Sequence, residues 1–391
     1  MGCRLRVSGP PKENKMDFGA LLHTISTITP DRPWGIDIPN YFWFTGSSAA
    51  AFIISSFAHV FGMKEYKPIA GFSLLLAFVL LVAAPMNLID DLRQPGRIIN
   101  FFFYGWENFP TSPMKWGVLL LIAYPLLILV EALVLYRPYF WFSKGVVRSQ
   151  EQIEKDHHLG VILGAIGIPL ALSVHGYTGY ILGAVHAIPL FHTPLMPILF
   201  LASAMVSGTG LLIILLPIFQ KFFTDFKRVD MEMMQRLARL LSWFIVIDLV
   251  IRFFWLTFAI TFNGEEKYAL KLFFGENFWE VLIVDYVICL FVPMAIGFTN
   301  YFTRSFKWVL FGGILSAIGV WIFRWNTVIG GQSIGKTTPF LLEYHPHSTG
   351  FDSILSVLSN WSLLIALVAL VMVLFPWDKE MANYYVTKEE R

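Results

Sequence analysis

The chain has 391 residues, of which 56% are hydrophobic and only 14% are charged. Soluble domains carry about 25% charged residues, which keep their surface hydrated, so this composition excludes an ordinary soluble protein. The formal net charge of +2 excludes the strongly basic surface that nucleic-acid binding requires.

Nine apolar segments occur along the chain, and each is long enough to cross a bilayer. A helix needs about 20 mostly apolar residues to span the hydrocarbon. The runs are continuous rather than alternating, which excludes the strands of a membrane β-barrel. The sequence therefore predicts an all-α, multi-pass membrane protein. The nine segments are residues 40–62, 69–89, 116–136, 159–181, 195–219, 239–262, 278–302, 308–326 and 354–376.

Basic residues in the loops predict the orientation. One set of loops carries 13 Lys and Arg residues, and the opposite set carries six. Because cytoplasmic loops are enriched in Lys and Arg, we expect a periplasmic N-terminus and a cytoplasmic C-terminus in a bacterial inner membrane. Residues 1–33 are then a periplasmic tail, and residues 331–391 hold an outer loop, the ninth span and a cytoplasmic tail.

Polar residues gather at the outer ends of three spans. Ionisable groups inside a membrane are costly and often mark function. Imidazole and phenol groups can bind the two carbonyl oxygens of a quinone, and a carboxylate beside them can take up a proton. Tyrosines also anchor spans at the lipid head groups, which is the competing interpretation. The residues are Asn40 and Tyr41 in the first span, Asp90, Asp91 and Arg93 after the second, and His175 and Tyr177 near the end of the fourth.

Charged residues also occur deeper in the spans. Glu131 lies about 15 residues inside the third span, roughly 22 Å from its outer end. We predict that it relays protons together with His158 at the start of the fourth span; a hydrogen bond between helices is the alternative. A later polar set favours a charge-paired structural core, because Asp248 and Arg252 share one helix face and Asp285 lies at a similar depth. Arg324 and Asn326 of the eighth span complete this set.

The chain offers no ligand set for an electron-carrying cofactor of its own. Its two cysteines are too few for an iron–sulfur cluster, which normally takes four. A haem between spans needs two histidines at matching depth, whereas His59 lies on the inner side and His175 on the outer side.

Six stretches at the span ends make the chain resemble the NrfD/PsrC family, the polysulfide-reductase-type membrane subunits of respiratory complexes. They span about 300 residues and are WGIDIPNYFWFTGSSAAAF (34–52), LIDDLRQPGR (88–97), PTSPMKWG (110–117), HGYTGYILG (175–183), TPLMPILFLASAMVSGTGL (193–211) and RWNTVIGGQ (324–332). The resemblance implies two four-helix bundles, residues 34–185 and 193–330, followed by an extra ninth helix.

The resemblance also implies a menaquinone site in the first bundle. In the family this site lies near the face that docks a ferredoxin-like iron–sulfur subunit, which serves a catalytic subunit such as a molybdopterin enzyme. The matching positions are Asn40, Tyr41, Asp90, Asp91, Arg93, His175 and Tyr177.

We therefore expect a quinol-binding membrane anchor that has no catalytic activity alone and exchanges electrons between the menaquinone pool and a periplasmic iron–sulfur subunit. Two other classes stay open. A secondary transporter would have repeated halves and broken helices near the midplane. A structural anchor would have lost the quinone site.

Overall fold

The computed structural model of the chain describes residues 34–92, 94–139, 150–224, 229–262, 264–334, 344–379 and 381. Its regular structure in these ranges is helical, apart from an isolated bridge between His347 and Ser353. The predicted all-α class is confirmed. The predicted periplasmic tail (1–33), Arg93 and residues 382–391 of the predicted cytoplasmic tail lie outside the described residues.

Each of the nine predicted spans is helical. Within the described residues, eight helical segments are long and apolar enough to cross a membrane. The remaining one, α2, carries serine, threonine and asparagine, and almost all of it is buried among the others. In chain order the long elements are α2 (Asp37–His59), α3 (Lys67–Asp91), α5 (Pro113–Tyr136), α6 (Gln150–Gly183), α7 (Met196–Phe223), α8 (Met231–Phe262), the π-helix η6 (Glu280–Phe291) with its continuation α10 (Val292–Phe298), α12 (Phe306–Trp325) and α14 (Ile354–Leu374).

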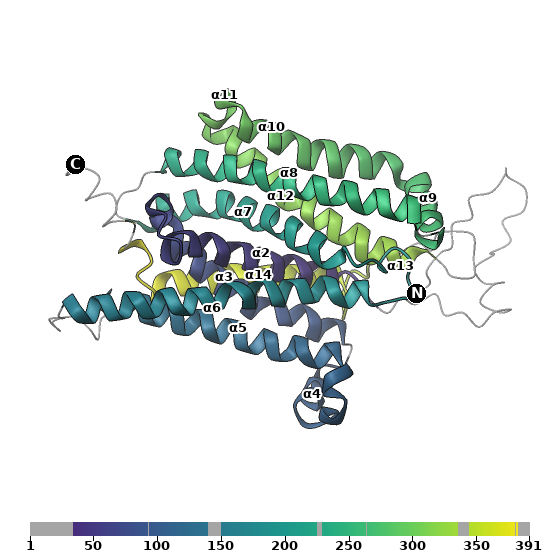
Figure 1. Ribbon diagram of the computed structural model, residues 1–391, viewed down its shortest axis with the longest axis horizontal. Helices are drawn as coiled ribbons and strands as arrows, with labels where there is room; N and C mark the ends of the chain where they lie inside the picture. Colours follow the sequence, from purple (N-terminus) through teal and green to yellow (C-terminus); the bar gives the residue numbers. More distant parts are fainter. Residues whose placement is uncertain are drawn as a thin grey trace, which may run out of the picture.

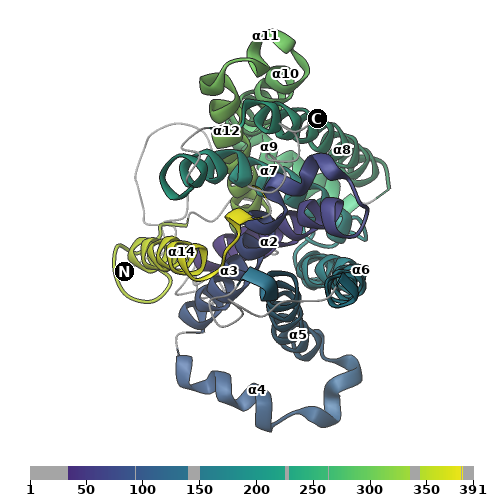
Figure 2. The ribbon, with the colours of Figure 1, turned by 90° about the vertical axis from the view of Figure 1, so that its left-hand side faces the viewer.

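Shorter helical elements connect the long helices. Three of them, η2 (Pro95–Ile99), α4 (Asn100–Phe103) and η3 (Trp106–Thr111), form an arm between α3 and α5 that stands away from the other helices (Figure 2). The others are η1 (Lys64–Tyr66), η4 (Arg137–Tyr139), α9 (Gly264–Trp279), α11 (Asn300–Thr303), the π-helical η7 (Asn326–Gly330) and α13 (Gly331–Ser333).

The long helices run up and down, which gives the molecule two ends. We call them the Asp37 end and the His59 end, after the first and last residues of α2. Elements α9 and α13 lie at the Asp37 end, on the right of Figure 1, and α11 lies toward the opposite end. In the orientation predicted from the loops, the Asp37 end faces the periplasm.

Helix α2 lies at the centre and joins the two halves of the molecule. It packs against α3 and α6 on one side and against α7 on the other, and α7 packs in turn on α8 and α12. Small residues permit the close approach of α2 and α7. A Cβ atom on Gly208 would lie 2.4 Å from the Cβ of Ala50 and 2.8 Å from the carbonyl oxygen of Ser47. Such small-residue contacts are how membrane helices pack closely without a hydrophobic driving force.

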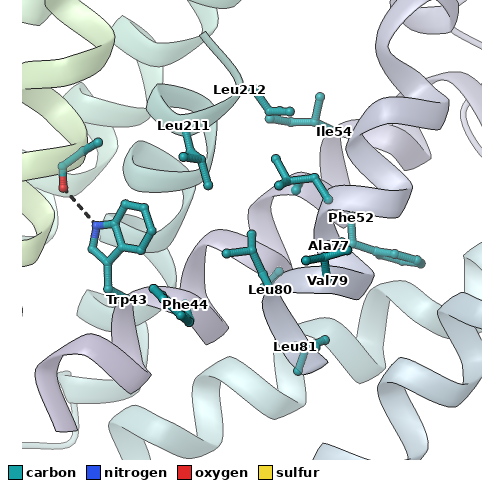
Figure 3. Packing of buried hydrophobic residues seen from close by; sticks show 14 of the residues in the cluster. Trp43, Phe44, Phe52, Ile54, Ala77, Val79, Leu80, Leu81, Leu211 and Leu212 are labelled. Carbon is teal, nitrogen blue, oxygen red and sulfur yellow. Dashed lines mark hydrogen bonds between the residues drawn. The ribbon is translucent and has the colours of Figure 1, made fainter. Parts of the chain in front are cut away.

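Large apolar side chains fill the space around α2. Trp43 and Phe44 lie near Leu211 of α7 and Leu80 of α3 (Figure 3), whereas Phe52 packs edge-on against Tyr124 of α5. The indole Nε1 of Trp43 donates a hydrogen bond of 2.9 Å to the carbonyl oxygen of Ala317 in α12. The rotation of α2 is thereby fixed relative to three neighbouring helices, which determines where its polar side chains point.

Candidate functional site

The predicted site residues lie around the first two turns of α2, at the Asp37 end. They do not meet in one place. They separate into a phenol pair (Tyr41 and Tyr177), an amide cluster that contains Asn40 and Asp90, and a buried contact between His175 and Arg324. Arg93 lies outside the described residues.

The phenol pair lies between α2, α5 and α6. The ring of Tyr177 packs directly on the backbone of α5, where a Cβ atom on Gly117 would fall 2.2 Å from it. The Tyr177 hydroxyl is 3.9 Å from the sulfur of Met114, a weak acceptor. Tyr41 is buried and interacts electrostatically with Tyr177. Among the described residues, no acceptor receives a hydrogen bond from the Tyr41 hydroxyl. The Tyr41 hydroxyl is thus a donor that no described residue engages, and the Tyr177 hydroxyl donates only a weak bond to sulfur.

The amide cluster occupies the opposite side of α2, against α3 and α14. Asn40 donates to Oδ1 of Asn87 (2.6 Å), and its own Oδ1 accepts from Nε1 of Trp361 (2.9 Å). Asn360 donates to Oδ1 of Asn87 (3.0 Å) and to the carboxylate of Asp90 (2.9 Å). Because these groups satisfy one another, the cluster joins three helices rigidly. The sequence interpretation did not assign Asn360 and Trp361 to the site.

Carboxylates surround the N-terminus of α2. Asp91 accepts a hydrogen bond from the backbone N–H of Gly35 (3.4 Å), and both oxygens of the fully buried Asp37 lie 2.7 Å from the hydroxyl of Ser356. Asp352 lies so close to Gly35 that a Cβ atom there would fall 1.7 Å from its oxygens. Negative charge is favourable beside a helix N-terminus. Within the described residues, no group of His, Cys, Asp and Glu has the arrangement of a metal site.

His175 faces away from the phenol pair. It is fully buried, and its Nε2 lies 2.8 Å from the carbonyl oxygen of Phe200 in α7. Arg324 of α12 donates to the same carbonyl (2.9 Å) and to the hydroxyl of Ser203 (2.8 Å), and its Nη2 is 3.3 Å from His175. A Cβ atom on Gly46 would lie 2.7 Å from the imidazole, so glycine is needed there. His175 therefore links α6 to α2, α7 and α12.

The later spans contain the predicted ion cluster, although Arg324, which was expected in it, bonds to Phe200 and Ser203 beside His175. Nε of Arg252 is 2.8 Å from the carboxylate of Asp248, and its Nη1 is 2.9 Å from that of Asp285. All three side chains are almost completely buried. The guanidinium also lies 4.0 Å from the ring centroid of Phe323. The structure confirms a charge-paired core between α8, η6 and α12.

Glu131 is buried in α5. Its Oε1 would be 3.1 Å from a Cβ atom on Gly164 of α6, and it interacts electrostatically with His59 of α2. His158 is exposed, six residues before Gly164 on α6. The predicted relay of Glu131 with His158 stays a prediction. The same Cβ position on Gly164 would lie 2.6 Å from Val60, which follows His59 at the end of α2.

An apolar cavity of about 820 Å³ lies between α7, α12 and α14. This volume is within the range of ligand pockets. Trp43 and Trp361 line it, and their rings are 5.0 Å apart between centroids. Since Trp361 also donates to Asn40, the two indoles separate the apolar cavity from the amide cluster.

The chain matches a known protein family over most of its length. The family described as "Polysulphide reductase, NrfD" matches residues 25–335. This range contains the phenol pair, the His175–Arg324 contact and the ion cluster, whereas α14 lies beyond it.

Several known proteins are similar to the chain. A selenate reductase subunit of Mesobacillus selenatarsenatis is 28% identical, over 94% of this chain and 89% of that protein. The Hdr-like menaquinol oxidoreductase integral membrane subunit of Archaeoglobus fulgidus is 24% identical, over 88% of this chain and 82% of that protein. A polysulfide reductase chain of Wolinella succinogenes is 30% identical, over 48% of this chain and 60% of that protein.

Proposed function

Because the chain belongs to the NrfD family of polysulphide reductase membrane proteins, we propose that it is the quinol-binding membrane subunit of a bacterial respiratory oxidoreductase. The chain is an integral membrane protein, and its relatives include subunits of a selenate reductase and of a menaquinol oxidoreductase. The latter supports menaquinol as the bound substrate. No observation favours the transporter alternative.

The phenol pair carries the proposal of a quinone site. A quinone presents two carbonyl oxygens that accept hydrogen bonds, and the matching quinol presents two hydroxyls. Tyr41 and Tyr177 offer hydroxyls that can both donate and accept, and they come from different helices at the same end of the bundle. The amide cluster holds Asn40 and therefore fixes its neighbour Tyr41 on α2. The quinone-binding roles of Asn40, Asp90, Asp91 and His175 stay predictions.

In this proposal electrons leave or enter at the Asp37 end. The chain has two cysteines and no cysteine set for an iron–sulfur cluster, so a ferredoxin-like subunit docked at this end accepts or supplies them and serves a catalytic subunit. The distribution of Lys and Arg in the loops supports a periplasmic position for the Asp37 end. The phenol pair lies close to this end, which keeps the distance to such a partner short.

Binding of a quinol-analogue inhibitor to the purified complex tests the site. We expect Tyr41→Phe and Tyr177→Phe each to weaken binding about tenfold, the effect of one lost hydrogen bond. Tyr301→Phe is the matched control, because Tyr301 is 78% exposed on α11. Unchanged binding in both site variants contradicts the proposal.

A further inference from the structure

A stripe of hydroxyl and imidazole groups runs along one face of α2 from the Asp37 end to the His59 end. Its members are spaced by three, four or seven residues, which places them on the same helix face. The first and the last are 18 positions apart, or about 27 Å at 1.5 Å per residue. All of them are buried. They are Tyr41, Thr45, Ser48, Ser55 and His59.

Helix α5 adds two polar groups to the half of this stripe nearer His59. Tyr124 is fully buried and Glu131 is 1% exposed. The Tyr124 ring packs edge-on against Phe52, one turn after Ser48 on α2, with the ring centroids 5.5 Å apart. Glu131 lies seven residues further along α5, about 10 Å nearer the His59 end, where a Cβ atom on Gly164 of α6 would fall 3.1 Å from its Oε1 and 2.6 Å from Val60, the residue after His59. The order His59, Glu131, Tyr124, Ser48 therefore leads from one end toward the centre of the molecule.

Two atoms of this series have unused hydrogen-bonding capacity. Among the described residues, Oε2 of Glu131 and the hydroxyl of Tyr124 have no hydrogen-bond partner. Buried polar atoms in proteins are nearly always bonded to protein or to ordered water. The helices around them present mostly apolar side chains, so water is the ligand that fits. A carboxylic acid, a phenol and an imidazole joined by water are groups that pass protons.

We infer that His59, Glu131 and Tyr124, with bound water, form a proton relay between the His59 end and the phenol pair. This inference rests on the proposed function. When a quinol is oxidised to a quinone, two electrons pass to the iron–sulfur subunit at the Asp37 end and two protons leave through the relay to the His59 end. Quinone reduction reverses both flows. Since electrons and protons use opposite ends, each turnover moves charge across the membrane.

The gap between Tyr124 and the phenol pair is the last step of the path. Tyr124 follows Gly117, the contact of Tyr177, by seven residues on α5, which is about 10 Å along the helix. Thr45 lies between Tyr41 and Ser48 on α2, and its hydroxyl bonds to the carbonyl oxygen of Tyr41 (3.0 Å). Thr45 is therefore the side chain that bridges this interval.

The test uses the intact complex in liposomes with a soluble quinol analogue. Electron transfer to the partner subunit and pH changes on both sides of the membrane are recorded together. We expect protons at the His59 end, and a loss of turnover of about 100-fold in Glu131→Gln, the scale of a lost acid–base group. Tyr124→Phe should also slow turnover, whereas Glu131→Asp should restore part of it. Inhibitor binding should remain unchanged in all three variants.

Glu154→Gln is the matched control, because Glu154 is an exposed carboxylate in the first turns of α6, toward the His59 end of the molecule. Proton exchange at the Asp37 end, or turnover of Glu131→Gln equal to that of the control, overturns the relay and leaves the quinone site intact. A wild-type complex that neither binds the analogue nor oxidises it contradicts the proposed function itself. Infrared difference spectra give a second readout, since a carbonyl band from a protonated carboxyl should disappear in Glu131→Gln.

Discussion

Tyr177 of α6 lies against Gly117 of α5 so closely that a Cβ atom on Gly117 would fall 2.2 Å from its ring. Helix α5 therefore contacts the Tyr177 ring through its backbone atoms, because Gly117 has no side chain. A larger side chain at this position would have to displace either the Tyr177 ring or one of the two helices. The position of Tyr177 relative to Tyr41 depends on it.

The first prediction concerns this contact. Gly117→Ala should push the Tyr177 ring out of place and weaken binding of a quinol-analogue inhibitor by about tenfold or more, because the phenol can no longer reach the ligand. Binding is measured by titration of the purified complex. Gly264→Ala is the control, since a Cβ there meets nothing within 4 Å. Equal affinities of the two variants would show that Tyr177 does not contact the ligand.

The second prediction concerns the amide cluster. Trp361→Phe removes the Nε1–H that donates to Oδ1 of Asn40 and leaves that buried acceptor without its partner. We expect a loss of about 1–3 kcal/mol in stability, seen as a lower midpoint of thermal unfolding of the detergent-solubilised complex.

Trp279→Phe provides the comparison for Trp361→Phe, because Trp279 is 71% exposed. The Trp279→Phe variant should unfold at the wild-type temperature. If both tryptophan variants unfold at the wild-type temperature, the bond to Asn40 does not hold α14 to α2.

The spans could be predicted from the sequence because the thickness of the bilayer sets the length of an apolar run. The bounds differ from the predicted ones where a helix continues beyond its apolar run. Helix α8 was expected at 239–262 and begins at Met231, since its first two turns carry polar residues such as Arg236. Helix α6 likewise begins at Gln150, before the apolar run.

The site could be predicted only in part. Tyr41 of α2 and Tyr177 of α6 lie at the same end of the bundle, and their role in quinone binding stays a prediction. His175 and Tyr177 are two residues apart, and such positions on a helix do not face each other, so helical periodicity alone could have separated them. The bond from Trp361 to Asn40 joins residues 321 positions apart. Which helix α14 packs against is decided by tertiary packing, which no local pattern reveals.

The third prediction concerns the ion cluster of the later spans. Arg252→Met leaves the carboxylates of Asp248 and Asp285 buried without their cation, and breaking a buried pair in this way costs about 3–5 kcal/mol. We expect a large fall in the yield of folded complex and in its unfolding temperature. Adding Asp248→Asn to this variant should recover part of the loss, because it removes one uncompensated charge.

Arg239→Met is the control for Arg252→Met. Arg239 is exposed and bonds to Asn300, and surface substitutions usually change stability by less than about 0.5 kcal/mol. If Arg252→Met and Arg239→Met unfold alike, the cluster contributes nothing to the fold.

The last prediction concerns pH at the Asp37 end, outside the spans. Burial raises the pKa of Glu266 in α9 to about 7, and the nearby His192 offsets part of the rise. Between the ordinary pKa of 4.5 and about 7, the folded state binds more protons than the unfolded state, so the stability of this segment falls as pH rises and then levels off.

Hydrogen exchange of the α9 amides, corrected for the intrinsic pH dependence, should therefore show easier opening at pH 8 than at pH 5. Glu266→Gln should abolish this difference, whereas Glu280→Gln should keep it, because the pKa shift belongs to Glu266. A pH dependence that persists in Glu266→Gln would assign the effect to another group, such as His192.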